Sequence, residues 1–263
     1  MTVFQAIILG IVQGIGEFLP ISSSGHLLLL QRFFGIEDNL LTFSIVVHVG
    51  TLIPVLIIYF NRIKGLIFKP FQKLTYLLII GTLPAIVVAL LFGDVLERIF
   101  SGNYLAVGFL ITALILFIVD TRPGGEKDIT ETTYLDAIII GVIQAFAITP
   151  GISRSGSTIF GGVTRKLDRK SAAEFSFLLS IPAIAGGAVL EILHLIRGEG
   201  AEAGFLLSAP VIVGFFVAMV VGYMAIKIML KLVVNNKLKY FSVYLVILSI
   251  IILADQFFIG RVF

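Results

Sequence analysis

Long apolar stretches fill most of this chain, and clusters of charged or turn-forming residues separate them. A helix needs about 20 apolar residues to cross a bilayer. Six stretches meet that length: 41–60, 74–92, 103–120, 172–196, 206–230 and 240–259. Two further apolar pieces, 2–34 and 134–164, are interrupted by polar breaks rich in Gly and Ser. Each of these two pieces is expected to form a short helix, a break and a second short helix.

Broken helices are tolerated at membrane depth only where protein or a water-filled cavity covers the freed backbone groups. The two pieces are therefore predicted to be re-entrant helical hairpins, each followed by three full spans. A hairpin returns the chain to the side it entered from, and three spans carry it across, so the second hairpin enters from the opposite face. The predicted fold is an all-α polytopic membrane protein with an inverted-topology repeat. Its single domain, 1–263, would consist of repeats 1–120 and 132–263.

The two polar breaks also match at the level of single residues. Sliding the chain on itself by 131 positions superposes Ala6 on Ala137, Gly10 on Gly141, Gln13 on Gln144, Ser22 on Ser153, Ser24 on Ser155 and Gly25 on Gly156. The two copies differ where Glu17 opposes Ile148, Ser23 opposes Arg154 and His26 opposes Ser157. A repeat whose two copies carry different charges is expected to build one composite site where they meet.

Composition agrees with a membrane protein. The chain is 58% hydrophobic and only 13% charged, and a soluble domain cannot bury that much apolar surface. No Lys or Arg precedes Arg32, so the N-terminus lacks the basic region of a signal peptide and is expected to be retained. The absence of Cys excludes disulfides and thiolate metal sites.

Loop charges predict the orientation in the membrane. The side that carries both termini would hold four basic residues: Arg32, Arg98, Arg197 and Arg261. The opposite side would hold fourteen: Arg62, Lys64, Lys69, Lys73, Arg122, Lys127, Arg165, Lys166, Arg169, Lys170, Lys227, Lys231, Lys237 and Lys239. Basic loops face the cytoplasm. Both termini and the opening of the first hairpin are therefore expected outside, in a plasma or inner membrane.

The first break carries a group of chemically active side chains. Glu17 follows Gln13 by four residues, so the two share a helix face. A carboxylate at membrane depth indicates function by default, although capping of the next helix is the structural alternative. The run Ser22-Ser23-Ser24 is expected to start the returning helix, where free N–H groups favour phosphate. His26 follows Ser23 by three residues, a spacing that lets an imidazole reach the hydroxyl.

The second break places Arg154 in the same context. A guanidinium at membrane depth needs an anion, which is either Glu17 or a bidentate ligand phosphate. Together the two breaks would offer a carboxylate, a hydroxyl, an imidazole, a guanidinium and two helix starts. This set suits phosphoryl transfer. A lone His in an apolar span is more often structural, and His48 and His194 are interpreted that way.

These motifs resemble those of the undecaprenyl-diphosphate phosphatase family, the bacitracin-resistance membrane phosphatases. The first motif is matched by Gln13, Glu17, Pro20, Ser22, Ser23, Ser24, Gly25 and His26, and the second by Pro150, Gly151, Ser153, Arg154, Ser155 and Thr158. The resemblance implies hydrolysis of a polyisoprenyl diphosphate to the monophosphate and phosphate at an outward-facing site, which recycles the carrier lipid for cell-wall synthesis. Gln13 stands where many members have Glu, which weakens a metal site built on two carboxylates.

Roles follow for the matched residues. Glu17, Ser23, His26 and Arg154 are predicted to be catalytic, with Ser23 preferred as the nucleophile and His26 kept as its rival through a phosphohistidine. The expected substrate-binding residues are Gln13, Ser22, Ser24, Gly25, Gly151, Ser153, Ser155 and Thr158. A Mg²⁺ or Ca²⁺ ion held by Glu17 and Gln13 would arrive with the diphosphate, because hard ions favour oxygen ligands. No organic cofactor and no nucleic acid are expected, and a homodimer stays open.

An inverted repeat with broken helices also characterises secondary transporters. The alternative function is therefore transport or flipping of an anionic or polyprenyl-phosphate substrate through the same site. The cluster of Glu17, Ser23 and His26 favours an enzyme, because transport needs binding groups and not a nucleophile beside a base.

Overall fold

The computed structural model describes residues 1–93, 102–197 and 203–260. Within these ranges the chain is helical, with one isolated bridge between Lys127 and Leu167 and no strand. Five helices there are long and apolar enough to cross a membrane: α3 (Leu40–Ile58), α5 (Lys73–Leu91), α10 (Arg169–Ile196), α12 (Ala209–Val234) and α13 (Lys239–Ala254), which continues as the π-turn η2 (Asp255–Ile259). The protein is therefore an all-α, multi-pass membrane protein. The sixth expected stretch forms α7 (Leu105–Thr121), which is shorter at 17 residues.

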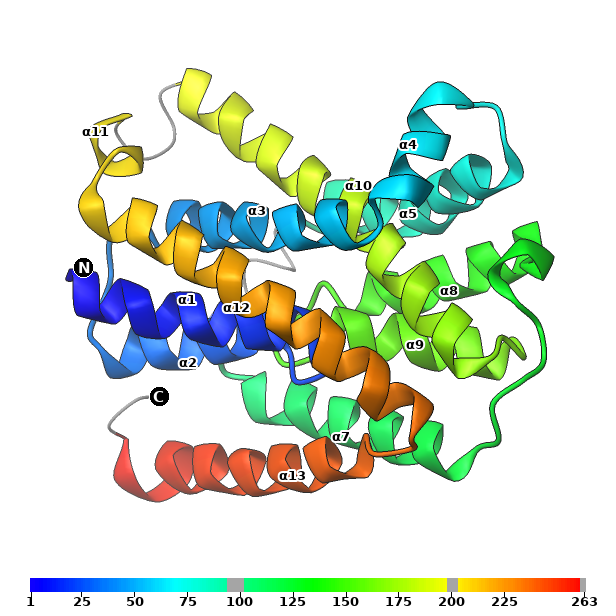
Figure 1. Cartoon of the computed structure of the whole chain (residues 1–263). Helices are drawn as coiled ribbons and strands as arrows, with labels where there is room; N and C mark the ends of the chain where they lie inside the picture. The colour runs from blue at the N-terminus through cyan, green and yellow to red at the C-terminus, as the bar shows by residue number, and fades with distance from the viewer. Residues whose placement is uncertain (94–101, 198–202, 261–263) are drawn as a thin grey trace.

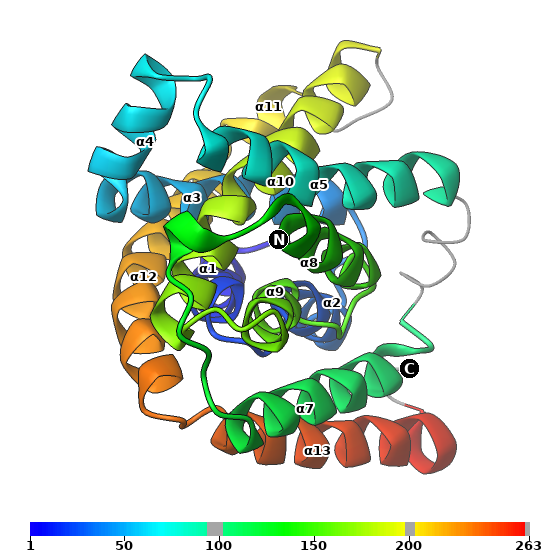
Figure 2. The ribbon, with the colours of Figure 1, turned by 90° about the vertical axis from the view of Figure 1, so that its right-hand side faces the viewer.

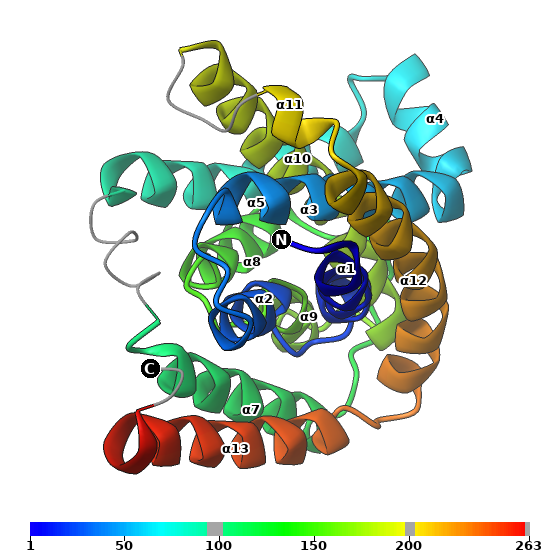
Figure 3. The same cartoon turned by 90° about the vertical axis from the view of Figure 1, so that its left-hand side faces the viewer.

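The two interrupted pieces form helical hairpins at the centre of the molecule. The first consists of α1 (Val3–Phe18) and α2 (Ser23–Phe33), and the second of α8 (Tyr134–Phe146) and α9 (Arg154–Thr164). Figure 1 shows the first hairpin entering from the left and the second from the right, so that their tips meet in the middle. The end-on views of Figures 2 and 3 show the long helices arranged around both hairpins.

The same capping devices start the matching helices of the two hairpins. Thr2 forms a capping box with Gln5 at the start of α1, and Thr133 forms one with Asp136 at the start of α8. A capping box satisfies two backbone N–H groups that a helix start leaves unpaired. The returning helices begin alike, because Ser22 Oγ caps α2 and Ser153 Oγ caps α9. These residues keep the 131-residue offset seen in the sequence.

The entering helix of each hairpin packs against a long helix from the other half of the chain. The entering helix α1 packs on α12, and α8 packs on α5. Both crossings depend on glycine: a Cβ on Gly10 would lie 2.7 Å from the Gly214 carbonyl oxygen, and one on Gly141 would lie 2.5 Å from that of Gly81. In addition α3 contacts α10, and α7 contacts α13. The two halves are therefore interlocked, and both contribute to each of the two buried apolar clusters.

Replacement of Gly141 with alanine is expected to destabilise the protein. The added Cβ would meet backbone, which has little freedom to move, and such overpacking costs roughly 1–3 kcal/mol. Gly186→Ala in α10 is the matched control, because the site is open and Ala is the better helix former. Thermal unfolding in detergent, followed by circular dichroism, should give a lower apparent Tm for Gly141→Ala only. Equal melting of Gly141→Ala and the wild type would contradict the close crossing.

Three short helices occupy segments that the sequence left as loops: α4 (Phe60–Phe68), the 3₁₀ turn η1 (Ile129–Glu131) and α11 (Ala203–Leu206). Figure 1 places α4, η1 and the turn between α9 and α10 at one end of the bundle, and the N-terminus and the end of α13 at the other. The expected basic residues Arg98 and Arg261 lie outside the described residues.

Candidate active site

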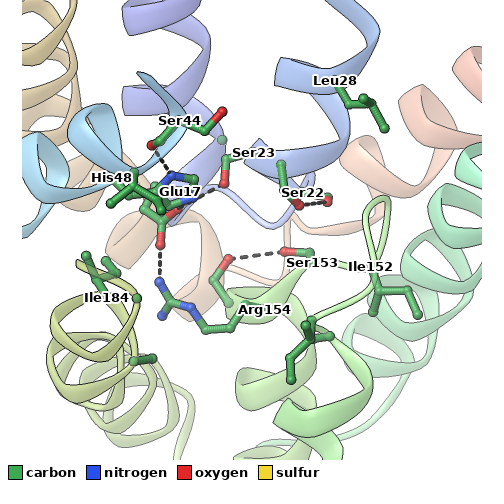
Figure 4. Close-up of a pocket in the computed structure, with 18 of the residues that line it drawn as sticks. Glu17, Ser22, Ser23, Leu28, Ser44, His48, Ile152, Ser153, Arg154 and Ile184 are labelled. Atoms are coloured by element: carbon green, nitrogen blue, oxygen red, sulfur yellow. Dashed lines mark hydrogen bonds and ion pairs between the residues drawn. The ribbon is translucent and has the colours of Figure 1, made fainter. Parts of the chain in front are cut away.

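A cavity of about 810 Å³ lies where the two hairpin tips meet (Figure 4). Its polar lining comes from both hairpins and from α3: Glu17, Ser22, Ser23, Ser24, Gln31, Ser44, His48, Gln144, Ser153, Arg154 and Ser155. Its remaining walls are largely apolar, with Leu28, Ile45, Ile152 and Ile184 among them. A polar centre within apolar walls suits a ligand that has a charged head and a hydrocarbon tail.

The two tips are tied together through Ser22. The peptide before Pro20 is extended, as the proline ring demands, and this ends α1. Ser22 then takes a positive φ of 67°, which is unfavourable for a residue with a side chain. In this conformation its Oγ accepts hydrogen bonds from Gly25 N at 3.4 Å and from Gly151 N at 3.1 Å. Gly151 itself has φ 88°, which glycine adopts readily.

Glu17 is the centre of the polar network. Its Oε1 forms an ion pair with Nη2 of Arg154, which joins the two hairpins. Its Oε2 accepts hydrogen bonds from Ser23 Oγ at 2.9 Å and Gln13 Nε2 at 3.0 Å. The sequence had paired Glu17 with Gln13 by helix spacing and named it as an anion for Arg154, and both contacts are present. The Ser23 hydroxyl therefore donates its hydrogen bond to a carboxylate, and Ser23 lines the cavity.

Arg154 is held from behind while its guanidinium faces the cavity. Nη1 donates to Ser176 O at 3.2 Å, and Thr158 Oγ1 donates to the Arg154 carbonyl oxygen at 2.9 Å. Arg154 is also the first residue of α9, as Ser23 is of α2, so two helix N-termini meet at the cavity. Helix N-termini and a guanidinium both attract anions, and phosphate above all.

The expected contact between His26 and Ser23 is absent. His26 is not among the residues that line the cavity; its Nδ1 lies 2.9 Å from Ser22 O and its Nε2 2.8 Å from Tyr244 Oη. The ring also stacks on Tyr244 and meets the edge of Phe109. The spacing argument was wrong on this point, because the backbone oxygen of Ser22 offers the His26 ring a local partner as well. In this position the ring connects α2 to α13.

His48, which sequence reasoning set aside as structural, lies in the site instead. Its Nε2 is 3.4 Å from Glu17 Oε2, and its Nδ1 is 2.6 Å from Ser44 O (Figure 4). Gln31, also missed, donates to Ser44 Oγ at 3.3 Å on the cavity wall. The signal in the sequence was the four-residue spacing of Ser44 and His48, which puts two polar groups on one face of an apolar helix.

Four residues expected to bind substrate lie behind the lining: Gln13, Gly25, Gly151 and Thr158. Gln13 contacts Glu17, and Thr158 supports Arg154 and Ser176. Gly25 allows the tips to cross, since a Cβ on it would lie 2.8 Å from Gly151 N. The other expected binding residues, Ser22, Ser24, Ser153 and Ser155, line the cavity.

Known proteins resemble this chain over nearly its whole length. The family model described as bacitracin resistance protein BacA matches residues 6–251, which include both hairpins. The chain belongs to the BacA family. It is 51% identical over 257 residues to the undecaprenyl-diphosphatase of Carboxydothermus hydrogenoformans, covering 97% of this chain and 98% of that protein. It is also 44% identical over 259 residues to undecaprenyl-diphosphatase 4 of Bacillus cereus, covering 98% of each chain.

A third relative extends the comparison across the family. The undecaprenyl-diphosphatase of Halothermothrix orenii is 41% identical over 263 residues, covering 98% of this chain and the whole of that protein. All three matches run over nearly the whole chain, so the resemblance is not confined to the two tips.

Proposed function

We propose that this protein hydrolyses undecaprenyl diphosphate to undecaprenyl monophosphate and inorganic phosphate. The observation that carries the proposal is Ser23, a hydroxyl hydrogen-bonded to the Glu17 carboxylate in a cavity that also presents Arg154. A nucleophile, an adjacent base and a cation for the phosphate are the parts that such a reaction needs. The names of the BacA relatives state the same activity.

Binding begins with the diphosphate at the two helix N-termini. Arg154 turns part of its guanidinium from Glu17 to the phosphate oxygens, where its fork can donate two hydrogen bonds. Ser22, Ser24, Ser153 and Ser155 line the same place and offer hydroxyl or backbone donors. These groups neutralise the charge that the diphosphate brings and hold its terminal phosphorus beside Ser23.

The reaction then takes two steps. Ser23 Oγ attacks the terminal phosphorus while its proton passes to Glu17 Oε2. The bond from that phosphorus to the bridging oxygen breaks, and Glu17 passes the proton on to the leaving prenyl monophosphate. In the second step Glu17 takes a proton from the water that attacks the phosphoserine, and it returns this proton to Ser23 Oγ as the bond from phosphorus to Oγ breaks and inorganic phosphate leaves. His26 supports this site from behind through Ser22 O. Glu17 is thus base and then acid in each step, and Ser23 is regenerated.

The prenyl tail leaves the cavity along its apolar side. Small side chains line this part: Ala85 on α5, and Ala183, Gly187 and Ala188 on α10. A wall of small residues leaves room for a chain of methyl-branched units, and the outer faces of both helices are apolar. We therefore place the tail between α5 and α10, with its end in the surrounding lipid.

In the membrane we propose six spans, with α7 as the sixth, and two re-entrant hairpins from opposite faces as an inverted repeat. The matched caps, and the clasping of α1 by α12 and α8 by α5, support this assignment. The gathering of α4, η1 and the turn before α10 at one end supports a cytoplasmic basic face. The cavity would then open outside, where release of undecaprenyl monophosphate recycles the carrier for cell-wall synthesis and counters bacitracin.

A divalent cation would enter with the substrate. Among the described residues no three His, Cys, Asp or Glu gather in a metal-ligating group, and Glu17 is already paired with Arg154. Gln13 Oε1, however, is buried without a hydrogen-bond partner, and it is an oxygen that a hard ion accepts. We propose that Glu17 and Gln13 would hold a Mg²⁺ or Ca²⁺ ion that arrives with the diphosphate. When bound, the ion would offset phosphate charge.

The test is phosphate release by the purified protein. Undecaprenyl diphosphate in detergent micelles should yield inorganic phosphate with the wild type, and Glu17→Gln should reduce kcat by about 10³-fold, because the base is lost. Glu126→Gln, a carboxylate change in an exposed loop, is the control and should match the wild type. The alternative function, transport, finds no support in the relatives, which are named undecaprenyl-diphosphatases. Lipid movement across vesicles without phosphate release would reverse the assignment.

A further inference from the structure

His48 is a partly buried polar group on the cavity wall, and the proposed reaction gives it no role. It sits on α3, its side chain is 25% exposed, and it lines the cavity. We propose that His48 is a positioning residue that holds the Glu17 carboxylate toward Ser23 and away from a closed pair with Arg154. The role rests on the proposed phosphatase function.

Both ring nitrogens of His48 face oxygen atoms that only accept hydrogen bonds. Nδ1 is 2.6 Å from the Ser44 carbonyl oxygen, and Nε2 is 3.4 Å from Glu17 Oε2. One nitrogen thus anchors the ring to its own helix, and the other is directed at Glu17. Glu17 Oε2 accepts hydrogen bonds from Ser23 and Gln13, and Nε2 of His48 lies beside the same oxygen.

These contacts oppose a competing arrangement. A guanidinium and a carboxylate favour a bidentate pair, in which both oxygens face the arginine fork. Here Arg154 meets only Oε1 of Glu17, and its Nη1 donates to Ser176 O. Rotation of the carboxylate onto Arg154 would take Oε2 away from Ser23 and would occupy the guanidinium needed by the phosphate. The contacts on Oε2 keep the Glu17 carboxylate oriented with Oε1 toward Arg154 and Oε2 toward Ser23.

The surroundings of His48 single out Glu17 as its target. On α10, which also packs against α3, Glu174 pairs with Arg62 and Glu191 accepts a hydrogen bond from Thr42. The described side-chain contacts of His48 are those to Ser44 and Glu17, so the ring connects α3 to the tip of α1 through the carboxylate itself. A histidine that only filled space would not need this connection.

Two substitutions at His48 distinguish a role as hydrogen-bond donor from a role that needs the imidazole ring itself. His48→Leu removes the donor, and His48→Gln keeps an N–H group at a comparable reach. We expect kcat for undecaprenyl diphosphate to fall by about 10²-fold in His48→Leu with KM almost unchanged, since misplacing a base affects the chemical step. His48→Gln should recover to within about tenfold of the wild type, because the longer and more flexible Gln side chain holds its N–H group less firmly. His194→Leu, on the exposed face of α10, is the matched control.

Other results would overturn the role. Wild-type kcat in His48→Leu would show that Glu17 needs no help, and equal loss in both variants would show that the ring itself is required. A lowered apparent Tm together with a raised KM would indicate structure and not positioning. If the wild type releases no phosphate, the proposed function fails together with the role of His48. If the wild type is active and His48→Leu is unimpaired, only the role of His48 fails.

Discussion

Ser23→Ala should lower kcat by at least about 10³-fold. The reason is that, among the described residues, no other cavity hydroxyl donates a hydrogen bond to Glu17. Ser22 and Ser24 hydroxyls bond each other at 3.4 Å, and those of Ser153 and Ser155 do so at 3.2 Å. The substrate should still bind, since the helix starts and Arg154 remain. The measurement is steady-state phosphate release together with direct lipid binding.

A control and a chemical trap make this prediction decisive. Ser249→Ala removes another buried hydroxyl, one that donates to Leu245 O on α13 and to Ala106 O on α7, and should leave kcat near the wild-type value. Rapid acid quenching followed by mass spectrometry should find the phosphoryl group on Ser23. A phosphoryl group on His26 would refute the assignment and restore the phosphohistidine mechanism.

Much of the fold could be predicted from the sequence because the bilayer restricts what apolar helices can do. All six apolar stretches became helices, five of them long enough to span, and both hairpins break at Pro20 and at Pro150-Gly151. Proline and glycine interrupt helices locally, so their effect is readable without tertiary information. The helices α4 and η1 were missed because short helices depend on local caps and surroundings more than on a long periodic pattern.

The site was predictable only in part, for a reason that His26 and His48 illustrate. Both are single imidazoles in apolar sequence, and helix spacing favoured His26 because Ser23 is three residues away. Spacing says which residues share a face, but not which face meets the cavity. In the structure His26 turns toward Tyr244 on α13, far along the chain, while α3 brings His48 to Glu17. Contacts between distant helices decided the matter.

Arg154→Lys should lower kcat/KM by about 10²-fold even though the charge is kept. A guanidinium can donate to Glu17 and Ser176 O from two of its nitrogens and then turn its planar fork to two phosphate oxygens. An ammonium is a point charge on a flexible side chain, so it cannot donate to two phosphate oxygens in a fixed geometry while it also contacts Glu17 and Ser176 O. Part of the loss should appear in KM, since the phosphate is bound in the ground state, and the rest in kcat.

The comparison that isolates geometry from charge is Arg165→Lys. Arg165 Nε donates to Asp136 Oδ1 at 2.6 Å, outside the cavity lining, and Asp136 also pairs with Lys127. A lysine at 165 preserves a cation in a pair that has a second partner, so kcat/KM should stay near that of the wild type. Near-normal turnover in Arg154→Lys would show that positive charge alone suffices at the cavity. Bidentate holding of the diphosphate by Arg154 would then have to be abandoned, and the two helix N-termini would remain to orient the phosphate.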